Sequence, residues 1–277
     1  GTSSGRLSSS NPNCFDDKTE VLTNNGWKLF KDLSNTDLLA QWGNNEITFS
    51  KPLNYIQYQY NGKMVWLHNQ HTDICATPDH KCLLLTRKDK ELFIDAKDYK
   101  EDYKQIHGGT YKGGLYQYSQ EFITLLVATQ ADGYYKKDGM VEFIFCKRRK
   151  YDRLLSSLIK LGASITYGTK GKSNKLYIRL RVHDKYNALI KKIMPNKCFT
   201  YDLLNMCEQS RNLFIKELDF WDGCITRPLM YVSKVKQNVD VLQALLALNN
   251  RRSITREQLV RGKVYYRFES TKDCNYS

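Results

Sequence analysis

Two stretches in the second half of the chain repeat one pattern. Residues 119–133 read SQEFITLLVATQADG, and residues 210–223 read SRNLFIKELDFWDG. Each stretch begins with a serine that can cap a helix, carries apolar residues at helical spacing, and ends in Asp-Gly, where glycine often terminates a helix. Asp132 and Asp222 are 90 residues apart. The pattern therefore predicts one structural unit present twice.

The residues after each stretch continue the repeat. Asp132 is followed by the strand-like MVEFIFC and the amphipathic KYDRLLSSLIKLG, and Asp222 by LMYVSK and QNVDVLQALLALN. We therefore expect two αββα-type repeats, at about 119–205 and 210–277, within an α/β domain that spans 116–277.

The positive charge of the chain lies entirely in this second part. The whole chain has a net charge of +14. Residues 1–115 hold 14 Lys/Arg against 14 Asp/Glu, whereas residues 116–277 hold 29 against 15. Such asymmetry is typical of a domain that binds a polyanion, with nucleic acid as the foremost candidate. A solvated basic surface is the alternative.

The first part of the chain has an all-β pattern. Turn-forming residues separate short alternating stretches, and Asn24-Asn25-Gly26 is a strong turn signal. We expect strands at 19–23, 47–53, 55–60, 63–68 and 81–86. The sequence thus predicts an α+β protein in which a β-rich domain at 14–115 precedes the repeated α/β domain.

Composition excludes several other classes of protein. The chain has no run of about eighteen apolar residues, so we expect no transmembrane helix and no membrane partner. Residues 1–13 are polar and rich in serine, without the apolar centre of a signal peptide, and are expected to be a leader. The eight cysteines form no CxxC pair and no cluster with zinc spacing, which favours a reducing, intracellular compartment.

Both repeated stretches resemble the LAGLIDADG motifs of homing endonucleases. LVATQADG, with the small residues Ala128 and Ala131, supplies the first motif, and IKELDFWDG supplies a more divergent second one. The resemblance implies that the two helices pair across a pseudo-twofold axis, so that Asp132 and Asp222 meet over duplex DNA. Carboxylates at helix C-termini repel each other and the helix dipole, and Mg²⁺ (or Mn²⁺) would relieve that repulsion. Two capped helices with chance Asp-Gly ends are the alternative.

A candidate DNA-binding surface follows from strand alternation. In KLYIRLRVH, polar side chains alternate with Leu176, Ile178, Leu180 and Val182. The polar face would consist of Lys175, Tyr177, Arg179, Arg181 and His183, and its counterpart in the second repeat of Tyr265 and Arg267. A cationic strand face can contact phosphates and base edges in the major groove. A solvated sheet face is the alternative.

A further catalytic candidate is Lys197, in PNKCF. It aligns with a lysine that endonucleases of this kind carry between the two motifs, although the proline usual after that lysine is missing. The resemblance implies that this lysine stabilises the transition state. Lys263 and Lys272 are the candidates for its counterpart in the second repeat.

The first part of the chain resembles the start of an intein, a self-splicing element with the Hint fold. Cys14 followed by an acidic, Thr-rich strand and a turn glycine is similar to the first intein block, and Thr77-Pro78-Asp79-His80 is similar to the TxxH block. The resemblance implies that the Cys14 thiol attacks the carbonyl of Asn13 to form a thioester, while Thr77 holds the scissile amide and His80 protonates or polarises it. An ordinary buried Cys14 and a hydrogen-bonded loop histidine are the alternatives.

An intein also needs a C-terminal His-Asn pair, and this sequence ends RFESTKDCNYS. The last block would then be omitted, supplied by a separate chain, or lost. Residues before Cys14 would belong to the host protein in cis. We expect a monomeric, bifunctional intein that cuts an intein-less host allele. The rivals are a LAGLIDADG-scaffold maturase or regulator that binds without cleaving, and a Hint autoprocessing domain that cleaves but does not splice.

Overall fold

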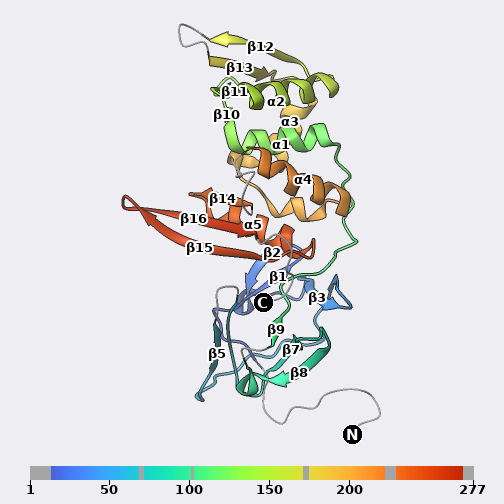
Figure 1. Cartoon of the computed structure of the whole chain (residues 1–277), viewed down its shortest axis with the longest axis vertical. Helices are drawn as coiled ribbons and strands as arrows, with labels where there is room; N and C mark the ends of the chain where they lie inside the picture. Colours follow the sequence, from blue (N-terminus) through green and yellow to red (C-terminus); the bar gives the residue numbers. More distant parts are fainter. Residues whose placement is uncertain (1–13, 69–71, 101–102, 171–174, 222–228, 271–277) are drawn as a thin grey trace.

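The computed structural model describes residues 14–68, 72–100, 103–170, 175–221 and 229–270. The chain forms an elongated molecule of three stacked parts (Figure 1). A β-rich part lies at one end, the first α/β repeat lies at the other, and the second repeat lies between them. The α+β class predicted from the sequence is confirmed.

The β-rich part consists of small antiparallel sheets. One sheet has the order β2-β1-β3-β4, and β5 pairs with β6, while β8-β7-β9 form a third sheet. Their bounds are β1 Glu20–Thr23, β2 Gly26–Leu29, β3 Leu39–Gly43, β4 Glu46–Ser50, β5 Val65–His68, β6 Asp73–Ala76, β7 Lys81–Leu85, β8 Glu91–Asp95 and β9 Lys104–Gln105. Two 3₁₀ turns, η1 Phe30–Asp32 and η2 Ala96–Asp98, interrupt them.

One predicted strand of this part is wrong. Residues 55–60 form no strand, and β4 ends at Ser50, so that residues 51–53 also lie outside it. The alternating YIQYQY sequence has the right pattern, but a strand needs a hydrogen-bonded neighbour, and among the described residues none pairs with it. The segment is instead an exposed loop that is fastened by a hydrogen bond from the Tyr55 hydroxyl to the Ser34 carbonyl.

The two α/β repeats share one strand order. The first repeat contains α1 Gln120–Asp132, β10 Gly133–Tyr135, β11 Val141–Phe145, α2 Arg148–Lys160, β12 Ile165–Lys170, β13 Lys175–Leu180 and α3 Lys185–Ile193. The second contains α4 Glu208–Trp221, β14 Met230–Ser233, α5 Lys236–Ala247, β15 Ser253–Val260 and β16 Lys263–Ser270. The order β11-β13-β12 in the first sheet matches β14-β16-β15 in the second, as expected for an internal duplication.

The second helices of the two repeats match in detail. The residue before α2, Lys147, has φ −100° and ψ 114°, and its counterpart Val235 before α5 has φ −103° and ψ 112°. Both helices then form an ion pair between their first and fifth residues, Arg148–Asp152 and Lys236–Asp240. The similarity therefore extends from the topology to individual interactions.

One helix terminus differs from the sequence prediction. Ser119 caps α1 by accepting a hydrogen bond from the Phe122 amide at 3.2 Å, as predicted. Ser210 does not cap α4, because α4 begins two residues earlier and buries Ser210 in its first turn. Gly133 ends α1 with an extended φ of −75°, and a glycine fits there because a Cβ atom would lie 2.6 Å from the Thr129 carbonyl oxygen.

Helices α1 and α4 pack against each other at the centre of the two repeats. They run in the same direction, since the Tyr118 amide, just before α1, donates to Ser210 Oγ near the start of α4 at 2.8 Å, while Lys150 contacts the last residues of both helices. The core around them is continuous and includes Leu125, Leu126, Ala128, Phe214 and Leu218.

The β-rich part is joined firmly to the second repeat. The Trp27 indole donates to the Asp240 carbonyl of α5 at 3.1 Å. Beside it, Gly26 has φ +105°, and a Cβ atom there would lie 2.3 Å from the Tyr201 ring, so only glycine fits. Residues 109 and 111 donate backbone hydrogen bonds to the end of α5, at Ala247 and Leu248.

The described residues bear on two expectations from composition, namely membrane-spanning helices and the state of the cysteines. No helix among them is long and apolar enough to cross a membrane. Their six cysteines are free thiols: Cys14, Cys75, Cys82, Cys146, Cys198 and Cys207.

Arg211 provides a test of the junction between the parts. Its side chain is completely buried, and its guanidinium donates to the carbonyls of Tyr111, Gly113 and Met206, which fastens residues 111–113 to the start of α4. We expect Arg211→Met to lower the free energy of unfolding by about 2–4 kcal/mol, because buried carbonyls lose charged donors. Urea unfolding measures the change. The exposed Arg256→Met is the matched control, expected to stay within about 0.5 kcal/mol of wild type, and equal effects of the two variants would contradict the role of Arg211.

Candidate functional site

The ends of α1 and α4 meet at one side chain. Lys150, the third residue of α2, places its Nζ 2.8 Å from Asp132 Oδ2 and 5.4 Å from the centre of the Trp221 ring. Asp132 is the last residue of α1, and Trp221 is the last residue of α4. A single ammonium group therefore joins the two helix termini at which the sequence predicts a shared centre.

Only part of the predicted metal centre lies within the described residues. Asp222 lies outside them, directly after Trp221. The described residues contain no group of three or more His, Cys, Asp or Glu side chains that would hold a metal ion by themselves. Mg²⁺ needs fewer protein ligands, since it commonly binds one or two carboxylates together with water and substrate phosphates. The Asp132 side chain, 30% exposed at a helix C-terminus, is a hard oxygen donor that fits one such position.

Lys197 lies in the segment that follows α3. It ends the 3₁₀ turn η4 Pro195–Lys197, in which Asn196 and Lys197 have positive φ angles of 55° and 64°. The η4 turn contacts β10, which begins directly after Asp132, and the Tyr135 hydroxyl donates to the Met194 carbonyl at 2.8 Å. The structure thus brings the Lys197 segment to the strand that leaves the end of α1.

Neither candidate for a second lysine gains support. Lys263 begins β16, and β16 corresponds to β13 of the first repeat, so Lys263 matches the position of Lys175 rather than that of Lys197. It lies at the tip of the β15–β16 hairpin. Lys272 lies outside the described residues.

The predicted basic face of the first sheet is only partly correct. Ile178 and Leu180 of β13 are buried, whereas Lys175 is exposed and Tyr177 and Arg179 are partly exposed, as alternation predicts. The neighbouring Glu142 of β11 accepts a hydrogen bond from Arg179 at 2.7 Å, and this contact holds the pKa of Glu142 below its usual range although burial opposes it. An acidic group therefore neutralises part of this face.

Residues 181–183 do not continue that strand. β13 ends at Leu180, and Arg181, Val182 and His183 form an exposed turn that leads into α3. Asp184 ends the strand pattern because its side chain caps α3 by accepting from the Tyr186 amide at 2.8 Å. Val182 is 43% exposed and does not join the aliphatic face.

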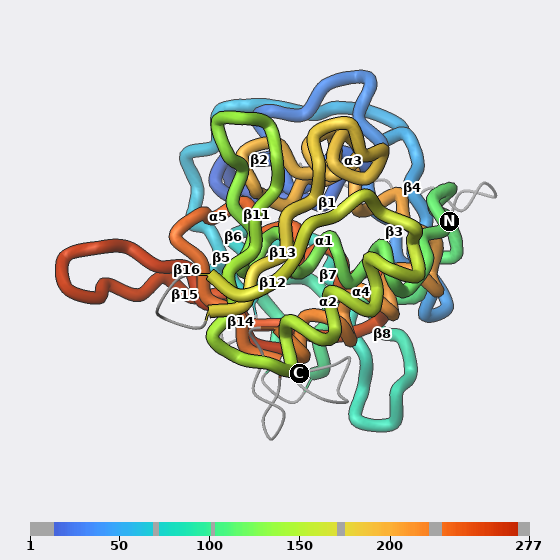
Figure 2. Tube along the Cα trace, turned by 90° about the horizontal axis from the view of Figure 1, so that it is seen from above, coloured from blue at the N-terminus to red at the C-terminus, as the bar shows by residue number. Residues whose placement is uncertain are grey.

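The second sheet carries a longer hairpin. Phe268 of β16 is buried, and Arg267 lies on the opposite face, where it pairs across the strands with Arg256. Tyr265 lies on the same face as Arg267, with the Lys234 ammonium 5.6 Å from its ring centre. Beyond the end of β14 the β15–β16 hairpin continues on its own and projects from the molecule (Figure 2). The projecting part exposes Leu259, Val260 and Val264.

Cys14 and Thr77 are brought together in the β-rich part. The backbone amide of Cys14 donates to Thr77 Oγ1 at 3.1 Å, and the Thr77 amide donates to the Cys14 carbonyl at 2.9 Å. The Cys14 amide belongs to the peptide bond that joins Cys14 to Asn13. Thr77 is 3% exposed, so its hydroxyl is held in place by its surroundings. Asn13 itself lies outside the described residues.

His80 lies next to this pair. Its ring centre is 4.0 Å from that of Phe15, and the His80 amide donates to the Thr77 carbonyl. Its Nδ1 atom is buried and has no hydrogen-bond partner among the described residues. Burial lowers the pKa of His80 to about 4, so the imidazole is neutral at physiological pH.

The prediction from the sequence missed two residues at these sites. Tyr58, within the segment expected to be a strand, hydrogen-bonds with Cys14, and desolvation together with this contact raises the pKa of Tyr58 to about 12. Lys150 contacts Asp132 from α2, 18 residues along the chain. A tyrosine in an alternating run and a lysine in a basic run carry no signal in the sequence that marks them.

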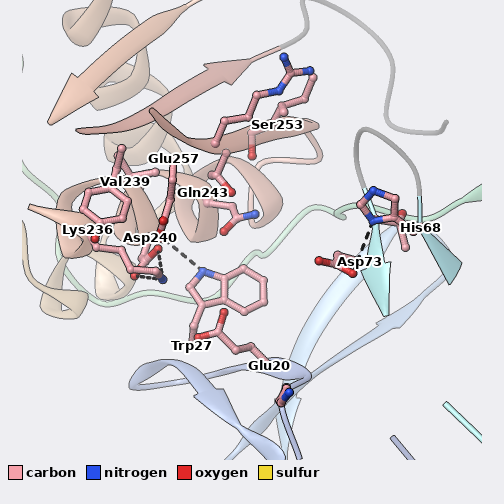
Figure 3. Close-up of a pocket in the computed structure, with 16 residues that line it drawn as sticks. Glu20, Trp27, His68, Asp73, Lys236, Val239, Asp240, Gln243, Ser253 and Glu257 are labelled. Atoms are coloured by element: carbon pink, nitrogen blue, oxygen red, sulfur yellow. Dashed lines mark hydrogen bonds and ion pairs between the residues drawn. The ribbon is translucent and has the colours of Figure 1, made fainter. Parts of the chain in front are cut away.

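An open cleft of the described residues lies elsewhere. It has a volume of about 770 Å³ and lies between the β-rich part and the second repeat (Figure 3). Trp27 and the Lys236–Asp240 ion pair lie on one side, and His68 with Asp73 on the other. None of the described residues predicted as functional lines it.

Comparisons with known proteins give limited similarity. No family model matches the chain. The chain is 29% identical over 297 residues to ribonucleoside-diphosphate reductase subunit beta of Aquifex aeolicus (strain VF5), an alignment that includes 90% of this chain and 42% of that protein. The chain thus spans less than half the length of this relative.

Several solved structures are also similar. The homing endonuclease I-DmoI in complex with DNA and Mn matches with a TM-score of 0.39 and 14% identity, covering 55% of this chain and 89% of that one. The N-terminal LAGLIDADG domain of DUF199/WhiA matches with a TM-score of 0.37 and 12% identity, covering 55% and 78%. Similarity at this level does not define the fold or the activity of this chain.

The neutral state of His80 predicts a pH dependence. Below pH 6.5 the unfolded chain takes up a proton on this histidine while the folded chain does not, so His80 lowers stability progressively from about pH 6.5 to pH 4. The free energy of unfolding of wild type minus that of His80→Leu should therefore be more positive at pH 7.5 than at pH 4.5. Urea unfolding at both pH values measures it, and because the carboxylates titrate in both proteins, their contribution cancels. An unchanged difference would contradict the lowered pKa.

Proposed function

We propose that residues 116–277 form a metal-dependent, site-specific DNA endonuclease of the LAGLIDADG type. The observation that carries the proposal is the parallel packing of α1 on α4 with both C-terminal ends against Lys150. That packing brings the two repeats together about one centre, which a pseudo-symmetric cut of two DNA strands requires. Trp221, the residue before Asp222, lies against the same ammonium as Asp132.

Charge supports DNA as the substrate. The excess of Lys/Arg lies wholly in residues 116–277, and both repeats present an antiparallel sheet with arginine and tyrosine on the face opposite the core. An antiparallel ribbon fits the major groove, and its cations replace counterions along the phosphates. Binding should therefore weaken steeply with increasing salt.

Each residue of the centre would have a definite task. The carboxylates of Asp132 and Asp222 would hold Mg²⁺ or Mn²⁺, which when bound supplies an activated water and charge stabilisation at a phosphodiester. Lys197, held near β10 by η4, would place its ammonium at the reacting phosphate. The cationic sheets would fix the duplex so that the same phosphate reaches the helix ends.

Two rival functions differ from the nuclease in the residues that they require. A LAGLIDADG-scaffold maturase or regulator would need the basic sheets but not a paired acidic centre. A ribonucleotide reductase subunit would need a cluster of carboxylate and histidine metal ligands in a helical bundle, and no such cluster occurs among the described residues. The alignment covers 90% of this chain but only 42% of the reductase subunit. This coverage fits an element inserted into a longer host protein.

Plasmid cleavage tests the nuclease. The substrate is a supercoiled plasmid that carries the flanking host gene joined without the coding segment of this chain. We expect wild type to linearise it in Mg²⁺ and Asp132→Asn to cleave at least about a hundredfold more slowly, since the cation loses a charged ligand. Gel electrophoresis follows the linear product.

The matched control for this experiment is Asp138→Asn. Asp138 is an exposed aspartate six residues along the chain that pairs with Lys136 at 2.8 Å. It should cleave like wild type, and both variants should retain DNA binding. Binding without any metal-dependent cleavage by wild type would favour a maturase or regulator instead.

A second activity is favoured by the contact at Cys14. We propose that residues 14–115 form most of a Hint-type splicing domain in which the Cys14 thiol attacks the Asn13 carbonyl. The hydrogen bond from the Cys14 amide to Thr77 Oγ1 supports this proposal, because it holds the nitrogen that must leave. The attack forms an S–C bond, breaks the C–N bond and frees the amine of Cys14, which takes up a proton.

Neutral His80 suits the same step. Its Nδ1 is buried without a hydrogen-bond partner among the described residues, and it would serve the scissile amide because a neutral imidazole can pass a proton to the departing nitrogen. Hydrolysis or thiolysis of the thioester would release the upstream residues.

Cleavage by dithiothreitol tests the acyl shift. The chain with its upstream residues should lose the segment before Cys14, and mass spectrometry detects the product. We expect no cleavage in Cys14→Ala and a decrease on the order of tenfold or more in Thr77→Val, which removes the hydroxyl at constant shape. Thr86→Val, which loses a hydrogen bond from the Lys90 amide in a distant hairpin, is the control and should react normally. Equal rates in the two threonine variants would contradict the role of Thr77.

A further inference from the structure

Lys150 is an unusually buried cation. It is 8% exposed and lies in the first turn of α2, whereas the preceding Lys147, Arg148 and Arg149 are exposed. A buried ammonium is costly unless a counter-ion accompanies it, and the Asp132 carboxylate fills that role at 2.8 Å. The Asp132 carboxylate in turn needs a nearby cation, because a carboxylate at the C-terminal end of a helix is disfavoured by the helix dipole.

The second repeat has no equivalent cation among the described residues. Lys150 is the third residue of α2, and the third residue of α5 is Asn238. Asn238 is 2% exposed, and its amide is engaged with Ser233 Oγ at 3.2 Å and with the Phe199 backbone amide at 2.8 Å. At one matched position, the first repeat thus has an ammonium and the second repeat a neutral amide.

The ammonium and a divalent cation would bind the same carboxylate. Lys150 Nζ donates to Asp132 Oδ2, which is one of the oxygens available to Mg²⁺. Two cations at one carboxylate repel each other, more strongly where water is partly excluded. Lys150 cannot leave easily, since its Nζ also lies over the Trp221 ring and its stem is buried. The metal must therefore bind against the charge of the lysine.

We infer that Lys150 is a positioning residue that holds Asp132 in the metal-free protein and weakens binding of the divalent cation at the ends of α1 and α4. The inference rests on the proposed nuclease. It also makes the two repeats unequal in charge at the centre they share. The ammonium stabilises the paired helix ends until DNA phosphates and the cation arrive together.

Metal binding without DNA tests the inference. Mn²⁺ affinity is measured by isothermal titration calorimetry on the full chain, and the melting temperature is measured in EDTA and in Mn²⁺. We expect Lys150→Met to bind Mn²⁺ on the order of tenfold more tightly than wild type, since one opposing charge is removed at nearly constant volume. The same variant should melt at a lower temperature in EDTA, so that Mn²⁺ raises its melting temperature by more than it raises that of wild type.

Three further variants sharpen the experiment. Lys160→Met removes the last residue of α2, whose Nζ lies 3.8 Å from Glu121 at the start of α1, far from Asp132. This variant should leave Mn²⁺ affinity unchanged. Lys150→Arg keeps the charge and should return the affinity toward the wild-type value. Lys150→Gln is a second neutral replacement, so that the result does not depend on the folding of one variant.

The outcomes separate this inference from the nuclease itself. Wild type that cleaves DNA, with unchanged or weaker Mn²⁺ affinity in Lys150→Met and Lys150→Gln, overturns the inference and leaves the nuclease standing. Absence of saturable Mn²⁺ binding in wild type and in both neutral variants also overturns it. Tighter Mn²⁺ binding in both neutral variants, reversed by Lys150→Arg and absent in Lys160→Met, supports it.

Discussion

The packing of α1 on α4 is the constraint on which the arrangement of the two repeats depends. Each helix begins beside the other, through Tyr118 and Ser210, and each ends beside Lys150. Between these points, buried Glu217 of α4 accepts hydrogen bonds from Gln120 of α1 and from Arg153 of α2. Polar contacts buried within an apolar interface fix its register, since any sliding would leave a charge without its partner. The two sheets are then held at opposite sides of one shared centre.

The duplication could be predicted from the sequence because it rests on local patterns. Apolar spacing and the Asp-Gly ends gave the positions of α1, α2, α4 and α5, and the strand order of the two sheets agrees with them. Side-chain alternation also gave the buried and exposed faces of β13 correctly up to Leu180. These features depend on a residue and its close neighbours in the chain, and such neighbours are visible in one sequence.

The errors arise where a distant partner decides the structure. Residues 55–60 alternate like a strand but lack a pairing strand, and residues 181–183 continue an alternation that the helix cap at Asp184 interrupts. Ser210 has the right residue type for a cap, but its hydroxyl bonds to the segment before α1. Lys150 and Glu142 change the charge of the predicted metal and DNA surfaces, and both act through residues that are remote in sequence.

We propose that the ends of α1 and α4 hold one divalent cation between them. Iron-mediated cleavage of the protein backbone tests it most directly: Fe²⁺ replaces Mg²⁺, and ascorbate with peroxide then generates radicals that cut the chain near the bound ion. Mass spectrometry of the fragments should find cuts in the same sample near residues 132 and 222, both suppressed by excess Mg²⁺ and by Asp132→Asn. Cuts near only one of the two helix ends, or at sites unaffected by Mg²⁺, would contradict the account.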